Sequence, residues 1–328
     1  MMSSERPWSK PGEWRNRSRL VRIVRLARTA RPVTFNDKVR YKLLRDHRRL
    51  MVTFADKAAM REYVARTVGP EHLPRALLLT DDPGLLLHAD LPEEFVLKPT
   101  HGSGACVVVD PGAPAEARLP KPEQEWTYTH VRPEHADRER LAAIAVAWRR
   151  KRYGRGPNHE WAYGEVPRQV LVEELLQGPD LGVPADYKMF VFHGRSRFVQ
   201  VDGARFGART QDFFDRDWTP VSLTGGHPRS AAPPARPQLL CEMVRLAEAL
   251  GAETDFVRVD LFCLTDRIVV GELTSSPAGG DSPFHPAEWN RLFGDTWVVP
   301  RRYEEERGTP LQPGVRARQS PAHEWDHE

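Results

Sequence analysis

The stretch FVRVDLFCLTDRIVVGELT, residues 256–274, decides the fold prediction for this chain. Two runs rich in β-branched and aromatic residues flank Thr-Asp-Arg, which predicts a β-hairpin with a short turn. With a loop at 265–267, Asp260 on the first arm faces Glu272 on the second. Like charges that face one another directly across two strands are destabilising. The hairpin therefore predicts a compensating positive charge beside these two acids.

The faces of the hairpin follow from the alternation of side chains along a strand. Arg258, which faces Thr274, shares the face of Asp260 and can supply part of the positive charge. On the second arm, the expected members of the matching face are Ile268, Val270, Glu272 and Thr274. A hard divalent cation with oxygen ligands would supply the remaining charge. The alternative is a surface hairpin whose acids pair only with Arg258 and solvent.

Bulk composition is that of an ordinary globular protein. The chain has 328 residues, of which 40% are hydrophobic and 28% charged, and no apolar run reaches the ~20 residues of a membrane span. The first twenty residues lack the apolar segment of a secretory signal. Three isolated cysteines, with no Cys-x-x-Cys spacing, predict reduced core residues and a cytoplasmic location.

Positive charge is concentrated at the N-terminus. Residues 1–50 hold 15 Arg and Lys against 4 Asp and Glu, so their net charge is +11. The whole chain has a net charge of +3, so the remaining residues carry −8. In RLVRIVRLARTAR, residues 19–31, an arginine recurs at every third position, which gives no continuous apolar face. We interpret residues 1–30 as a basic, partly mobile leader. The alternatives are weak contact with anionic lipid, a polyanionic partner or nucleic acid, of which nucleic acid is the least expected.

The strand patterns occur mostly as hairpins, which predicts largely antiparallel sheets with helices outside them, an α+β fold. Thr34 and Asp37 have capping-box spacing, and Asp56 is a second helix cap. Tandem strand patterns follow, including DYKMFVFHGRSRFVQVD, which predicts a hairpin turning at 193–194. The expected organisation is an N-terminal helical subdomain at 31–93, a sheet-rich domain at 94–300 and a disordered tail at 301–328.

Several polar residues stand at strand ends where ligand chemistry is common. Lys98, one of eight lysines, precedes a Gly-Ser-Gly loop whose backbone amides could approach phosphate oxygens, although a plain hairpin turn explains the glycines equally well. Lys188 lies in an apolar strand, where a lysine needs an anionic partner unless it faces solvent. Glu173 and Glu174 lie at another strand exit, so one is expected to face inward and the other outward, and paired surface acids are the simpler interpretation of them alone.

The order of these features resembles the ATP-grasp superfamily, and most closely its TupA-like (teichuronopeptide-biosynthesis-type) branch. The similarity extends from about Arg31 to Trp297 and is carried by FVLKPTHGSG, WAYGEVPRQVLVEELL, DYKMFVFHG, FVRVDLF and GELTSSPAGG. The resemblance implies an ATP-grasp fold in which ATP binds between two sheets of the 94–300 domain.

The resemblance also implies roles for individual residues. Lysines 98 and 188 would contact ATP, a loop would close over its phosphates, a hinge segment would meet adenine and an acid would hold the ribose. The lysines are Lys98 and Lys188, and the loop consists of His101, Gly102, Ser103 and Gly104. The hinge consists of Glu173, Glu174 and Leu175, and the ribose-binding acid is Asp180. Arg258 would steady the transferred phosphate, and Arg205 would grip the substrate. Asp260 and Glu272 would bind Mg²⁺, with Mn²⁺ as an alternative.

One position departs from the wider superfamily pattern. The third metal ligand there is commonly an asparagine two residues after the glutamate, and here that position is Thr274. A threonine hydroxyl is also a neutral oxygen ligand, so the resemblance still implies a metal site of Asp260, Glu272 and Thr274.

The function implied is an ATP-dependent ligase that joins a carboxylate to an amine through an acyl phosphate. The branch is associated with cell-envelope polysaccharide and polyamino-acid assembly, so the expected substrates are amino acids, peptides or glycan-linked carboxylates. Residues 275–280, SSPAGG, would form a wall of the acceptor pocket. The alternatives are an ATP-dependent phosphotransferase on the same fold and a non-catalytic nucleotide-binding protein.

Overall fold

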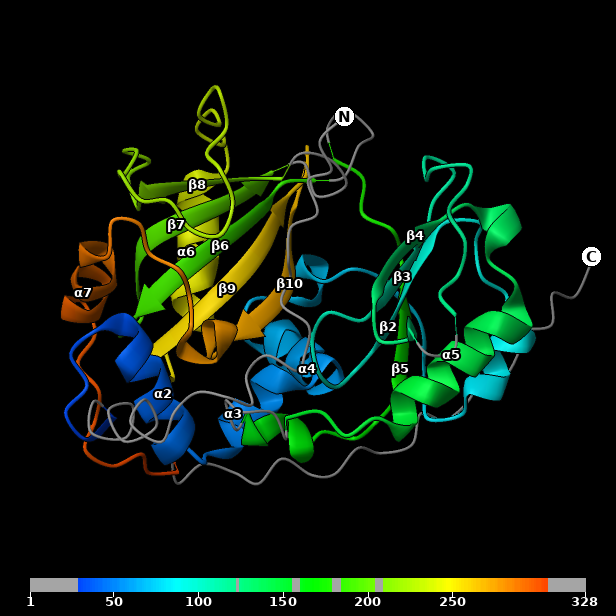
Figure 1. Cartoon of the computed structure of the whole chain (residues 1–328), viewed down its shortest axis with the longest axis horizontal. Coiled ribbons are helices and arrows are strands. Elements are labelled where there is room, and N and C mark those ends of the chain that lie inside the picture. The colour runs from blue at the N-terminus through cyan, green and yellow to red at the C-terminus, as the bar shows by residue number, and fades with distance from the viewer. Residues whose placement is uncertain (1–28, 122–123, 155–159, 179–183, 204–208, 306–328) are drawn as a thin grey trace, which may run out of the picture.

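The computed structural model describes residues 29–121, 124–154, 160–178, 184–203 and 209–305, and shows two five-stranded sheets (Figure 1). The first sheet, sheet A, has the strand order β1-β5-β2-β3-β4. Its strands are β1 (Ala76–Thr80), β2 (Phe95–Pro99), β3 (Cys106–Val109), β4 (Tyr128–Val131) and β5 (Val170–Glu173). Only β3 and β4 pair in parallel, and the other neighbours in sheet A are antiparallel.

The second sheet, sheet B, has the order β10-β9-β6-β7-β8, and all of its pairs are antiparallel. Its strands are β6 (Asp186–Phe192), β7 (Arg195–Gly203), β8 (Thr210–Asp215), β9 (Phe256–Cys263) and β10 (Ile268–Thr274). The β6–β7 hairpin turns at His193 and Gly194, which both have positive φ, as expected from the sequence. The mainly antiparallel α+β fold is therefore confirmed.

Helices pack on the sheets and between them (Figure 1). They are α2 (Phe35–Arg45), α3 (Arg49–Ala55), α4 (Lys57–Thr67), α5 (Arg138–Arg150), α6 (Leu240–Leu250) and α7 (Glu288–Asp295), with short 3-10 helices η2 (Pro70–His72), η3 (Pro83–Leu87), η5 (Pro133–His135), η6 (Trp161–Gly164) and η7 (Pro277–Gly280). Thr34 and Asp37 form the predicted capping box of α2, and Asp56 caps α4 through the amide of Ala58. None of the described helices is long and apolar enough to cross a lipid bilayer.

Three apolar cores hold these layers together. The largest lies between sheet B and the helices α3, α4 and α6, and a second lies between sheet A and α5. The third is aromatic and surrounds Phe35 of α2, which contacts rings from sheet B, α7 and the segment that follows α7. Because buried aromatic pairs add to the energy of area burial, this third core fixes α2 against one end of sheet B.

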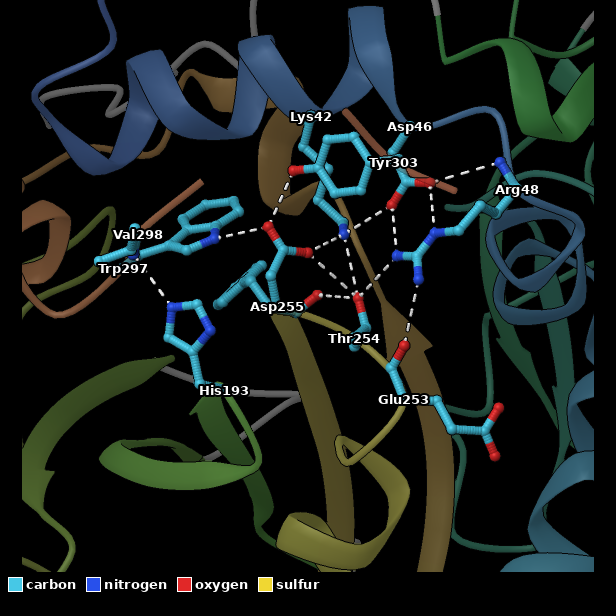
Figure 2. Close-up of polar contacts among 11 residues, drawn as sticks. Lys42, Asp46, Arg48, His193, Glu253, Thr254, Asp255, Trp297, Val298 and Tyr303 are labelled. Carbon is cyan, nitrogen blue, oxygen red and sulfur yellow. Dashed lines mark hydrogen bonds and ion pairs between the residues drawn. The ribbon is translucent and has the colours of Figure 1, made fainter. Parts of the chain in front are cut away.

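A buried polar network joins the same helix to the last described residues (Figure 2). Lys42 of α2 is 2% exposed and pairs with Asp46, Thr254 and Asp255. The second carboxylate oxygen of Asp255 accepts hydrogen bonds from the indole of Trp297 and the hydroxyl of Tyr303, both at 2.8 Å. Removing one partner of a buried ion pair typically costs about 3–5 kcal/mol, because the other charge is left buried and unpaired, so loss of Lys42 or Asp255 should disturb the position of α2.

Two segments differ from the organisation expected from sequence. Residues 76–80, expected in a helical subdomain, form strand β1 and pair with β5 of sheet A. Their apolar side chains Leu77 and Leu78 pack on the core of sheet A, and this long-range packing was not visible in the local pattern. Tyr303, expected in a disordered tail, is tied to Asp255. The remaining domain boundaries stay a prediction, and residues 1–28 and 306–328 lie outside the described part.

The β9–β10 hairpin has the predicted pairing at its acids but not at its turn. Asp260 pairs with Glu272 and Arg258 with Thr274, as expected. Near the turn, however, Ile268 pairs with Cys263, and a bulge at Gly271 shifts the register by one residue. The bulge places Ile268 and Val270 in the apolar core, so the prediction that they share a face with Glu272 was wrong.

Candidate functional site

A cleft of about 270 Å³ opens where sheet A meets sheet B. Both sheets contribute to its wall, together with the start of α4, the glycine loop after β2 and the segment after β5. Its polar lining residues are Lys57, Lys98, Ser103, Glu173, Glu174, Asp186, Asp260 and Glu272. Its apolar lining includes Val96, Val108, Leu175, Leu176 and Phe262. A cleft with both apolar and charged walls suits a ligand that has an apolar part and a charged part.

On the sheet B side, the two facing acids lie beside an arginine. Arg258 binds Asp260 through both Nε and Nη2, each at 2.6 Å, and its Nη2 also donates to the Thr274 hydroxyl at 3.1 Å. Burial alone would lower the pKa of Arg258, but Asp260 and Glu272 hold it above its usual range. The arginine is therefore a permanent cation fixed beside the two acids, as the hairpin predicted.

Lys188 of β6 lies beside the same acids. Its Nζ pairs with Asp186, lies 3.0 Å from Asp202 and lies 3.8 Å from Asp260. Burial alone would lower the pKa of Lys188, but Asp260, Asp186 and Asp202 together raise it. The apolar strand pattern predicted an anionic partner for this lysine. It could not identify Asp202, which is brought close by the pairing of β6 with β7.

The donor set fits a magnesium ion. Burial raises the pKa of Asp260 to about 6, against the opposite effects of Arg258 and Lys188. Glu272 lines the cleft, and no described residue forms a hydrogen bond or ion pair with its carboxylate. No described cluster of three or more acids, histidines or cysteines could hold a metal alone. Mg²⁺ typically takes one or two carboxylates plus substrate phosphates, which matches this pair.

On the sheet A side, Glu173 joins two cations. It is 4% exposed, pairs with Lys98 and accepts from Arg61 Nη1 at 2.5 Å. Its neighbour Glu174 also lines the cleft and accepts from Arg267 Nη2 at 2.8 Å, so both acids reach the cleft wall, whereas one had been expected to face outward. Leu175 also lines the cleft. The structure thus brings Lys98, Glu173 and Leu175 together on the wall opposite Asp260.

Sequence reasoning missed Lys57. This first residue of α4 lines the cleft, and its Nζ donates to the Gly102 carbonyl of the glycine loop at 2.7 Å. Burial lowers the pKa of Lys57, with Glu272 acting in the opposite direction and Lys98 in the same direction. Its position directly after the predicted cap Asp56, and the scarcity of lysine in this chain, were the available signals.

The glycine loop rests on aromatic side chains. Trp126 Nε1 donates to the Ser103 carbonyl at 3.0 Å, and the Ser103 hydroxyl lies 2.8 Å from that of Tyr153. At Gly102, φ is +78°, and a Cβ there would lie 2.7 Å from Tyr153. Ser103 and Gly104 line the cleft, whereas His101 is buried behind the loop with its Nε2 on the Lys151 carbonyl at 3.1 Å. Only the tip of the predicted loop therefore reaches the cleft.

Two predicted residues cannot be placed, because Asp180 and Arg205 lie outside the described residues. The SSPAGG segment is divided. Ser275 and Ser276 border a small cavity of about 20 Å³ near Thr274, whereas Gly280 packs against the backbone of α2. That cavity has room for about one water molecule, so the prediction of a substantial acceptor wall applies at most to its first two residues.

Comparison with protein families gives one assignment. The sequence model of the TupA-like ATP-grasp family matches residues 155–298. This region belongs to the TupA-like ATP-grasp family. The matched region contains Glu173, Lys188, Arg258 and the acids Asp260 and Glu272, whereas the cations Lys57 and Lys98 precede it. No curated protein matches the chain.

Solved structures similar to this chain are distant. The ATP-grasp ligase PsnB with its minimal precursor is 14% identical at a TM-score of 0.36, covering 69% of this chain and 53% of that one. D-alanine–D-alanine ligase from Helicobacter pylori is 12% identical at 0.39, covering 76% and 60%. Macrocyclase MdnC from Microcystis aeruginosa MRC, bound to precursor peptide MdnA, is 12% identical at 0.33, covering 69% and 55%. This chain thus spans about half the length of PsnB.

One acid near the cleft gives a pH-dependent prediction. Asp56 is 5% exposed, and burial raises its pKa to about 6. Because the folded protein holds the proton of Asp56 more tightly than the unfolded chain, protonated Asp56 favours folding. This contribution to the free energy of unfolding is fully present below the unfolded pKa of 3.8 and is lost as pH rises through the folded pKa of about 6. Asn keeps the cap without ionising, so Asp56→Asn should stabilise the protein by about 1 kcal/mol at pH 8.

Thermal denaturation at pH 8 and pH 4 measures this effect. The gain should disappear at pH 4, where Asp56 is largely protonated in the folded protein. Asp137→Asn at the exposed cap of α5 is the matched control and should change little at either pH. An equal gain for Asp56→Asn at both values would contradict the burial argument.

Proposed function

We propose that this protein is an ATP-dependent ligase that joins a carboxylate to an amine. The observation that carries the proposal is the cleft in which Asp260 and Glu272 face one another on sheet B, opposite Lys98 on sheet A. Cations on both walls suit a triphosphate, and the facing acids suit the magnesium that accompanies it. The family match over residues 155–298 supports the same assignment.

Charged residues of the cleft take part in the first step, the formation of an acyl phosphate. A substrate carboxylate oxygen attacks the γ-phosphorus, the bond to the ADP oxygen breaks, and an acyl phosphate forms. Lys57 and Lys98 neutralise the phosphates, and Arg258 stabilises the charge on the transferred group from beside Asp260. Magnesium bound by Asp260 and Glu272 would supply further positive charge on the phosphate oxygens.

The second step requires an amine and the exclusion of water. The amine nitrogen attacks the acyl carbon, the bond to phosphate breaks, and the proton leaves to solvent or inorganic phosphate. Ser103 and Gly104 form the edge of the cleft nearest Lys57, where they can shield the acyl phosphate. We extend the proposal to cytoplasmic amino acid, peptide or glycan-linked carboxylates of cell-envelope polymer assembly.

Hydroxylamine trapping tests this function. The purified chain, ATP and Mg²⁺ are incubated with individual amino acids and with short peptides, and hydroxamate and ADP are measured together. We expect ADP release to depend on the carboxylate and to rise when hydroxylamine or an amine acceptor is present. Removal of Mg²⁺ with EDTA should stop both signals.

The same assay separates the rival functions. A phosphotransferase would accumulate a stable phosphorylated product without any amine or hydroxylamine. A non-catalytic protein would bind ATP and release no ADP with any carboxylate. Either result would reject the ligase.

A further inference from the structure

A small cavity lies beside the end of β10, next to the facing acids. Its volume is about 20 Å³, and its walls come from α2, α3, η6 with the residue before it, and the end of β10 with the two serines after it. A cavity of this size holds one group as large as a water molecule. The side chains around it that can accept hydrogen bonds include Glu160, Tyr163, Thr274, Ser275 and Ser276.

Glu160, the residue before η6, is a half-buried acid that lacks a positive partner among the described residues. Its carboxylate forms no hydrogen bond or ion pair with any of them. Burial raises the pKa of Glu160, and the negative charge of Glu272 raises it further. Lys42 also borders the cavity, but its ammonium is already held by Asp46 and Asp255. Because an acid withdrawn from water requires a partner of opposite charge, the cavity predicts a cationic ligand.

The cavity suits an ammonium group better than a metal ion. An ammonium group has about the size of a water molecule and donates three hydrogen bonds, whereas Mg²⁺ demands near-octahedral oxygen ligands. The hydroxyls of Tyr163, Ser275 and Ser276 bind no described residue, so they are free to accept from an ammonium group. No group of three or more acids, histidines or cysteines in the described part of the chain could hold a metal there.

The cavity is close to the groups that act on phosphate in the proposed reaction. Thr274 borders it and accepts a hydrogen bond from Arg258 Nη2 at 3.1 Å. Thr274 also follows Glu272 by two residues on β10, a rise of about 7 Å along the strand. A nitrogen bound beside Thr274 therefore lies next to the arginine that would stabilise the transferred phosphate.

The rest of an amine substrate has space to extend from this cavity. Trp161 and Tyr163 border it and also border a larger cavity of about 580 Å³, which reaches Tyr153 beneath the glycine loop. Burial raises the pKa of Tyr163, and the charges of Glu272 and Glu160 add to the effect, so this tyrosine lies near both acids. The larger cavity can hold the body of a substrate whose ammonium group occupies the small one.

We propose that Glu160 binds the ammonium group of the amine substrate in this small cavity. The hydroxyls of Tyr163, Ser275 and Ser276 serve as further acceptors. The inference rests on the proposed function and adds the residue that positions the amine. The ion pair holds the nitrogen beside the acyl phosphate until it loses a proton and attacks the acyl carbon. Because charge-assisted hydrogen bonds are stronger than neutral ones, Glu160 contributes most of the affinity.

Replacing Glu160 with glutamine tests the proposal with two nucleophiles and the carboxylate that hydroxylamine trapping identifies. Glycinamide carries an ammonium group and no carboxylate, whereas hydroxylamine is uncharged near neutral pH and needs no anionic partner. We expect Glu160→Gln to raise the KM for glycinamide about tenfold to a hundredfold, the usual loss for a hydrogen bond to a charged group. The KM for ATP, the Mg²⁺ requirement and the rate of hydroxamate formation should stay within about twofold.

A binding measurement without ATP keeps the test independent of turnover. Glycinamide hydrochloride should raise the melting temperature of the full chain in a saturable way, and Glu160→Gln should abolish this shift. Tetramethylammonium chloride supplies the charge without N–H donors, so it should shift neither protein. Glutamine has the size of glutamate and breaks no interaction with a described residue, so the fold should survive, which circular dichroism checks.

The matched control makes the same change of charge away from the cavity. Glu139 lies at the start of α5 and is exposed. Glu139→Gln should leave both the KM for glycinamide and the shift in melting temperature as in the parent chain. An equal rise of KM in the two variants would show a net-charge effect and overturn the amine site.

The remaining outcomes separate the amine site from the ligase. Hydroxamate formation with the same KM for glycinamide in the parent chain and Glu160→Gln rejects the amine site alone. A melting shift that Glu160→Gln abolishes, without ADP release under any condition, rejects the ligase alone. A changed Mg²⁺ requirement in Glu160→Gln would make Glu160 a metal ligand, and equal protection by potassium chloride would make the cavity a site for inorganic cations. Either result, or no effect of glycinamide on ADP release and melting, overturns the amine site.

Discussion

Replacing Glu272 with glutamine is expected to lower kcat by about a thousandfold while the fold survives. Removing one preorganised stabiliser of the transition state commonly costs 10²–10³ in rate, and loss of a metal carboxylate acts on the whole triphosphate. Glu272 forms no ion pair or hydrogen bond with any described residue, so the amide disrupts no packing interaction. Its removal also relieves the repulsion from Asp260.

ADP release in the presence of a carboxylate and hydroxylamine measures the loss, and thermal denaturation measures the fold. The matched control is Glu242→Gln on the exposed side of α6, which should leave both the rate and the melting temperature unchanged. A Glu272→Gln rate within about threefold of the parent chain would refute the metal assignment.

Replacing Lys188 with methionine should lower the stability of the folded protein. Three acids, Asp186, Asp202 and Asp260, surround its ammonium, and the side chain is only 10% exposed. Methionine leaves their charges facing one another with only Arg258 to balance them. Breaking a buried ion pair on one side costs about 3–5 kcal/mol. In a chain of this size, that corresponds to a loss of about 10 °C in melting temperature.

Differential scanning calorimetry with and without Mg²⁺ checks this prediction. A cation bound by Asp260 and Glu272 replaces part of the missing charge, so Mg²⁺ should raise the melting temperature of the variant more than that of the parent chain. Lys121→Met, at an exposed position with no ion pair to any described residue, should behave like the parent chain. A fully stable Lys188→Met protein would show that the three acids do not depend on this lysine.

The sequence predicted the facing acids correctly and their strand faces only in part. The β-branched runs on either side of residues 264–267 predict a hairpin. Asp260 and Glu272 lie equally far from the expected turn, which placed them opposite one another. The turn is one residue longer than expected, and the bulge at Gly271 restores the pairing. A glycine inside a strand pattern is itself a signal for a bulge, so this correction could have been read from the sequence.

Contacts between distant segments were beyond prediction from local patterns. The pairing of Glu173 with both Lys98 and Arg61 depends on where three separate elements meet. Lys57 was missed because a helix start says nothing about which cleft it faces. His101 was assigned to the closing loop by its place in the sequence, whereas the fold buries it against the end of α5. The spacing of hydrophobic residues predicts where helices and strands form. Which charged side chains lie close together depends on how those elements pack against one another.

The aromatic core around Phe35 and the network around Asp255 have a consequence for synthesis on the ribosome. Lys42 and Asp255 are 213 positions apart, so at about 5–20 residues per second α2 waits on the order of 10–40 seconds for its partner. Two of the neighbours of Phe35, Phe293 and Trp297, emerge later still than Asp255. Until those partners are made, the nascent helix exposes an aromatic side chain that the folded protein buries.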